Sequence, residues 1–132
     1  VVEIAKLISD DQAARYRNFM VKFSEVLSVT ELEMYKWIIY GVIGCSTQDL
    51  RNGVTPGKLF NLIRPRHPKA DTLQLNNLLS ALERVQTVQF KHKLQPLILD
   101  YSNNSLFVVD ANFLVYLSTH EKAELLNAIG LE

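Results

Sequence analysis

The sequence lacks several features that define whole classes of protein. It has one cysteine in 132 residues, Cys45, which excludes an internal disulfide and a zinc site built from cysteines. A lone cysteine is typical of a reducing compartment, so we expect the protein in the cytoplasm or in the nucleus. No apolar run approaches the roughly 18 residues that a membrane span requires, and we expect no contact with a membrane.

An excess of charge of either sign is also missing. The 14 lysine and arginine residues equal the 14 aspartate and glutamate residues, so no overall field attracts nucleic acid or an anionic membrane. The local exception is a basic loop that contains Arg64, Arg66, His67 and Lys69. Hydrophobic residues make up 48% of the chain, which is ordinary for a globular domain with a core.

Patterns for catalysis or cofactor binding are absent as well. Residues 53–58 (GVTPGK) superficially resemble a phosphate loop, but they contain a proline, one residue too few between the glycines, and a leucine after the lysine. Cys45 lies in no cysteine-hydrolase signature, and the three histidines, His67, His92 and His120, show no metal-ligand spacing. We therefore expect no enzyme, no cofactor and no metal.

What the sequence does contain is a series of short amphipathic helices. The first is capped by Asp10 or Asp11 and runs to about Leu27, with apolar residues spaced by three and four. Thr30 and Glu33 form a capping box that opens a second helix. Its core face holds Leu32, Tyr35, Ile39 and Val42, and it ends near Ile43 and Gly44.

Four more short helices follow. They are expected over 46–52, from the Thr55–Pro56 cap to Pro65, from Asp71 with Gln74 to Val85, and from Thr87 to Leu94. Six short helices within about 80 residues predict a compact antiparallel bundle.

The last third of the chain has a different pattern. Leu97–Leu99 and Leu106–Val109 flank the turn-rich segment Asp100–Ser105, which predicts a β-hairpin. A capping box of Ser118 and Glu121 predicts a last helix. Residues 112–117 are compatible with either a strand or a helix.

Three stretches carry a resemblance to a known family. Residues 30–40 read TELEMYKWIIY, residues 49–63 place a basic residue and a turn before the pair Leu59–Phe60, and residues 75–86 end in LERVQ. These stretches resemble the second helix, the third-to-fourth-helix block and the fifth helix of the death-effector domain, a member of the death-fold superfamily. The resemblance covers roughly the first 95 residues.

The fold class implied is all-α: a six-helix antiparallel bundle of death-fold type over residues 10–95, with a C-terminal hairpin and helix extension over 96–132. The implied function is non-catalytic, homotypic protein–protein interaction in apoptotic or innate-immune signalling. The implied partners are other death-effector or death-fold domains, together with self-association, and no nucleic acid is expected.

The resemblance also points to a surface charge triad of glutamate, arginine and aspartate. Glu31 occupies the first place and Arg84 the second, but Gln86 stands where the family has aspartate. An arginine between two carboxylates would be held by charge-assisted hydrogen bonds. With Glu31 alone opposite Arg84, the pair is a surface salt bridge that contributes about 0–1 kcal/mol.

An exposed apolar pair on the second helix is the family's other docking feature, and Trp37 and Ile38 fall at that place. Helical spacing independently puts Trp37 off the predicted core face, beside Met34 and Tyr40. Such a patch predicts a partner surface, since exposed aromatic groups of this kind commonly anchor interfaces. The alternative is that the C-terminal extension covers this second-helix patch (Met34, Trp37, Ile38 and Tyr40).

A second function stays open, because helices followed by a hairpin are also the parts of a winged-helix nucleic-acid-binding domain. In that case Leu97–Val109 is the wing and Asp71–Val85 the recognition helix. That helix carries Asn76, Asn77 and Arg84 but few cations, whereas phosphate contacts usually supply much of the affinity.

Overall fold

The computed structural model describes residues 10–26, 32–94 and 97–131. It is mostly helical, with one small sheet, as expected. The helices are α2 (Asp10–Ser24), α3 (Met34–Gly44), α4 (Thr47–Asn52), α5 (Pro56–Ile63), the 3-10 turn η1 (Arg64–Arg66), α6 (Leu75–Leu82), α7 (Val85–Lys91), α8 (Ala111–Thr119) and α9 (Lys122–Ala128). The strands are β1 (Leu99–Ser102) and β2 (Ser105–Val108). No helix within these ranges is long and apolar enough to cross a membrane.

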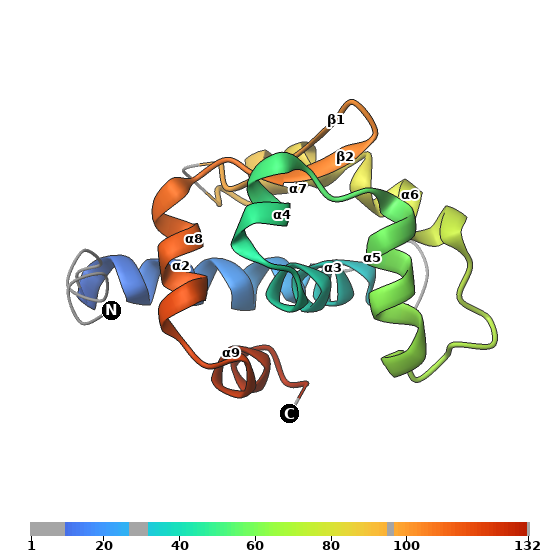
Figure 1. The fold of residues 1–132 in the computed structure, drawn as a ribbon, viewed down its shortest axis with the longest axis horizontal. Coiled ribbons are helices and arrows are strands. Elements are labelled where there is room, and N and C mark those ends of the chain that lie inside the picture. Colours follow the sequence, from blue (N-terminus) through green and yellow to red (C-terminus); the bar gives the residue numbers. More distant parts are fainter. Residues whose placement is uncertain (1–9, 27–31, 95–96, 132) are drawn as a thin grey trace.

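Helix α3 forms the centre of the molecule. It is in contact with four other helices, α2, α5, α6 and α9. Figure 1 shows the hairpin above α3 and α9 below it. Its residues are apolar around most of the helix, which is the pattern of a helix enclosed on all sides. The predicted core face is confirmed, because Leu32, Tyr35, Ile39 and Val42 are all buried.

Local capping explains where several helices begin. Ser46 Oγ accepts a hydrogen bond from Asp49 N–H. Thr55 Oγ1 accepts one from Lys58 N–H, which confirms the predicted cap. Gly53 ends α4 at φ 102°, a left-handed conformation that favours glycine. These two caps place the start of α4 and of α5.

Other predicted starts are wrong. Helix α3 begins at Met34, after Glu33 in a left-handed conformation that makes no side-chain cap, and Thr30 lies outside the described residues. Helix α6 begins one turn later than Asp71, because Asn77 Oδ1 accepts the Gln74 N–H at 2.8 Å. At the C-terminal end, Ser118 donates to its own helix instead of capping α9.

The predicted hairpin is confirmed, and its strands reach further into the turn than expected. Leu99 pairs with Val108 and Ser102 with Ser105, so only Asn103 and Asn104 form the turn. Both have positive φ, at 50° and 61°, and asparagine tolerates this conformation in two-residue hairpin turns. Val54, between α4 and α5, joins β2 through an antiparallel bridge to Leu106. The order across the sheet is therefore Val54, β2, β1.

The C-terminal helices share one hydrophobic core with the first helices. Asp110 caps α8 by accepting hydrogen bonds from the N–H groups of Asn112 and Phe113. Its Oδ1 also accepts a hydrogen bond from the Tyr16 hydroxyl, with the two oxygens 3.0 Å apart. The Tyr16 and Phe113 rings meet edge to face with their centroids 5.3 Å apart. The segment 112–117, left open by the sequence, is therefore helical and lies against α2.

Candidate functional site

Helices α5 and α6 form a packed pair, and α7 follows them in the chain before the hairpin. They contact each other directly, and the connection between them contains η1 and a turn in which Thr72 and Leu73 N–H both donate to Lys69 C=O. Leu78, Ala81 and Leu82 are the buried side of α6. Its opposite side presents Asn76 and Ser80 to solvent.

A run of cations extends from α4 through α5 and η1 to the loop before α6. Between residues 49 and 69 there are five lysine or arginine residues and one acidic residue, a local net charge of +4 in a chain whose net charge is zero. All five cations are exposed. We call this group of exposed cations the basic face; its members are Arg51, Lys58, Arg64, Arg66 and Lys69.

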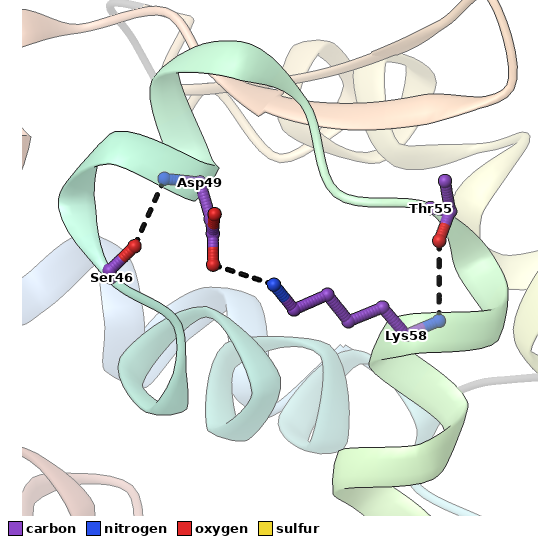
Figure 2. A network of polar contacts seen from close by, with 4 residues as sticks. All are labelled: Ser46, Asp49, Thr55 and Lys58. Atoms are coloured by element: carbon purple, nitrogen blue, oxygen red, sulfur yellow. Dashed lines mark hydrogen bonds and ion pairs between the residues drawn. The ribbon is translucent and has the colours of Figure 1, made fainter.

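One cation of the basic face is already paired. Figure 2 shows the Lys58 side chain reaching from α5 toward Asp49 on α4, with Nζ and Oδ2 2.6 Å apart. The hydrogen bond from Lys58 lowers the pKa of Asp49 below its usual value, and the same bond raises the pKa of Lys58. The pair is exposed to solvent, so a competing anion could displace the carboxylate.

Two other cations lie over aromatic rings. The guanidinium carbon of Arg64 is 6.0 Å from the centre of the Phe60 ring, and that of Arg66 is 5.8 Å from the Tyr40 ring. Such contacts hold a guanidinium at the surface without neutralising its charge. Neither arginine is within 4.0 Å of a carboxylate in the described part of the chain, where the ion pairs are Lys36–Glu33 and Lys58–Asp49.

His67 does not belong to the basic surface, contrary to the expectation for this loop. The residue is buried, Lys69 N–H donates to its Nδ1 at 2.9 Å, and its Nε2 lies 2.8 Å from Leu32 C=O. With Nδ1 acting as acceptor, the Nε2 must carry the proton and donate to the carbonyl. The imidazole is thus a neutral cross-link between the loop and the segment before α3.

The predicted exposure of the second-helix patch is wrong. Trp37 is 4% exposed, Met34 1% and Ile38 0%, and Tyr40 is half-buried. The His67 ring lies 5.0 Å from the Trp37 ring, and α9 of the C-terminal extension also packs on α3. Because elements distant in sequence cover α3 on several sides, helical spacing within α3 alone could not reveal the burial.

The expected charge triad stays a prediction, because one of its three residues is outside the described part of the chain. Arg84 is exposed at the start of α7. Gln86 instead donates from Nε2 to Asp100 Oδ1 at 2.8 Å and to Tyr101 C=O at 3.1 Å, so its side chain holds the hairpin. Glu31 lies outside the described residues.

Sequence reasoning missed Gln89, which is buried one turn after Gln86 and faces the same strand. Its Oε1 accepts the N–H groups of Ile98 and Leu99 at 3.0 Å each, and its Nε2 donates to Leu99 C=O at 2.7 Å. The two glutamines therefore bond to the outer edge of β1, as a neighbouring strand would. The signal was present as two amide residues spaced by three on a helix facing the hairpin.

Comparisons with known proteins give no family. No family model matches the chain, and no curated protein or solved structure matches it either. Within the described ranges, no three histidine, cysteine, aspartate or glutamate residues are grouped so that they could hold a metal ion. The candidate site consequently rests on geometry and charge alone.

Proposed function

We propose that this chain is a winged-helix module that binds double-stranded DNA. In this arrangement α5 and α6 are the helix-turn-helix pair, α6 enters the major groove, and the β1–β2 hairpin is the wing. The basic face holds the phosphates beside it. A winged-helix domain is the second function that the sequence left open, and the contacts of the described residues favour it over the death-effector interpretation.

The observation that carries the proposal is the bridge between Val54 and Leu106. Each residue donates its N–H to the other's C=O at 2.8 Å, so the segment before α5 becomes a third member of the sheet. The connectivity is then helix α4, the bridge residue Val54, three helices (α5, α6 and α7) and the two strands β1 and β2, with Val54 beside β2. A winged helix likewise has its first strand beside its last, and α7 is one helix more than that fold has between them. A plain six-helix bundle has no need of such a bridge.

Charge supports the same surface. The recognition helix α6 itself carries no cation, and the cations lie on the elements before it: Arg51 on α4, Lys58 on α5, Arg64 and Arg66 in η1, and Lys69 in the loop that follows. Phosphate contacts position a protein on DNA, and side chains that reach base edges specify the sequence. On α6, Asn76 and Ser80 are exposed for that second role. The hairpin from Leu99 to Val108 contains no lysine or arginine, so it adds shape and no charge.

The test is fluorescence anisotropy of a labelled DNA duplex over a range of salt concentrations. If the four unpaired cations of the basic face each contact one phosphate, the logarithm of the association constant should fall with the logarithm of salt with a slope of about −3.6. The double variant R64Q/R66Q should reduce that slope by about two units. A matched control, R17Q/K122Q, removes the same charge from α2 and α9 and should leave the slope unchanged.

Two results would contradict the proposal. The first is no duplex binding at low salt, and the second is an equal loss of binding in both double variants. The second result would mean that only total charge matters, and that the helix pair has no special role.

A second candidate is the homotypic interaction that the sequence resemblance implies. It is supported by the presence of six helices, α2 to α7, in the expected order. Its expected anchors Trp37 and Ile38 are buried, so association would have to use exposed positions such as Arg84. Light scattering over a range of protein concentrations tests this candidate, and R84E should then lower the apparent mass.

A further inference from the structure

A groove lies along α2, apart from the basic face. It consists of two adjoining cavities of about 470 and about 510 Å³, which share Lys22 and Leu94 in their walls. Helix α2 forms one wall. The C-terminal end of α7 and the residues after it form the other, with Ile98 alongside.

Cations line both walls of this cationic groove. Arg15 and Lys22 come from α2, and Lys91 and Lys93 come from the opposite wall. None of the four lies within 4.0 Å of a carboxylate among the residues that the structure describes. The acidic residues of the lining are Asp11 and Glu25, so cations outnumber them by four to two. Like charges across a groove repel each other, and an anionic occupant would relieve that repulsion.

The backbone at Lys93 adds a second observation. Lys93 has φ 57°, and the bonds from Lys93 N–H to Phe90 C=O and from Leu94 N–H to Gln89 C=O close α7 in a Schellman motif. Glycine usually occupies this left-handed position, and another residue there costs of order 1 kcal/mol. The left-handed conformation therefore costs some stability, and the residue that adopts it is a lysine in the groove lining.

The floor of the groove is apolar. Phe19, Leu94 and Ile98 are all nearly buried and contribute to its lining. A phosphate chain would leave such a floor unused, whereas a peptide that combines carboxylates with apolar side chains matches both floor and rim. We propose that the cationic groove binds an acidic amphipathic helix of a protein partner. From Asp11 to Lys22 the wall is about 16 Å long, which matches three turns of a bound helix.

The experiment uses the whole chain labelled with ¹⁵N and a synthetic peptide of about 14 residues made of leucine, glutamate and alanine, with leucines spaced by three and four. Amide chemical shifts should move at α2 and at residues 91–94, and should stay in place at α6. The reversed-charge variant K22E/K93E should weaken binding at least tenfold. The control R17E/K122E makes the same charge change outside the groove and should bind like the unaltered chain.

Three outcomes overturn the inference: no shift changes with millimolar peptide, shifts that map to α5 and α6, or equal binding by both variants. A thymidine oligonucleotide is titrated in parallel, and stronger binding of it in the groove would show that the occupant is a phosphate chain and that the peptide proposal is wrong. Because Lys22 and Lys93 are exposed, the variant should keep the helical signal of the unaltered chain. Duplex binding by K22E/K93E, measured separately, distinguishes a failure here from a failure of the DNA proposal.

Discussion

Replacing Gln89 by leucine should strongly destabilise the fold, because this side chain is the buried connection between α7 and β1. It is 1% exposed and bonds to three backbone groups at the edge of β1. In Q89L the N–H groups of Ile98 and Leu99 and the C=O of Leu99 lose their partners. An orphaned buried polar group costs about 1–3 kcal/mol, and the added apolar side chain returns part of this. We expect a net loss of about 3–5 kcal/mol in the free energy of unfolding, a large share of the 5–15 kcal/mol of an ordinary domain.

Gln86 supplies a matched control on the same helix. It also donates to β1, but it is half-buried and its partners are near solvent, so water can replace its bonds. Q86L should therefore cost no more than about 1 kcal/mol. Urea unfolding followed by circular dichroism measures both variants. A destabilisation by Q89L that equals that of Q86L would refute the argument, because burial would then not determine the cost.

If Q89L is too unstable to purify, Q89E gives a second test of the same contact. The glutamate keeps an acceptor for the two N–H groups, but once ionised it cannot donate to Leu99 C=O. Burial raises the pKa of such a carboxyl. Q89E should therefore become more stable as the pH falls through that raised pKa, a gain that the unaltered glutamine cannot show.

Three further predictions concern other parts of the fold. Burial and the hydrogen bond to Asp110 raise the pKa of Tyr16 from 10.0 to about 12, so the unfolded chain loses the hydroxyl proton at lower pH than the folded chain does. About 2–3 kcal/mol of folding stability, fully present below pH 10, should therefore be lost by about pH 12. Alkaline unfolding of Y16F should lack this loss. Asp49→Asn frees Lys58 from its ion pair, so the salt slope of duplex binding should steepen by about one unit, and an unchanged slope would mean that Lys58 makes no phosphate contact. His67→Ala removes the donor to Leu32 C=O and uncovers the Trp37 ring, which should lower the free energy of unfolding by about 2–4 kcal/mol. The fluorescence of this single tryptophan should shift to longer wavelength. Unshifted emission would show that His67 does not cover the ring.

Local chemistry in the sequence was sufficient for many of the elements. The cap at Thr55 and the hairpin over 97–109 follow from residues within a few positions of each other. The apolar spacing of α2 likewise predicted which of its side chains are buried. These features depend on backbone groups that a neighbouring side chain can satisfy, so short-range patterns are informative.

The tertiary structure decided what the exposed surfaces are. Helical spacing placed Trp37 on an outer face, yet His67, thirty positions later, and α9 enclose α3. The bridge from Val54 to Leu106 joins residues 52 positions apart and brings the segment before α5 beside the hairpin. The sequence by itself determined a series of short helices with one hairpin, because capping and apolar spacing are local. Which face is open to a partner was decided only by contacts between distant segments, because burial of a helix face depends on every element packed around it.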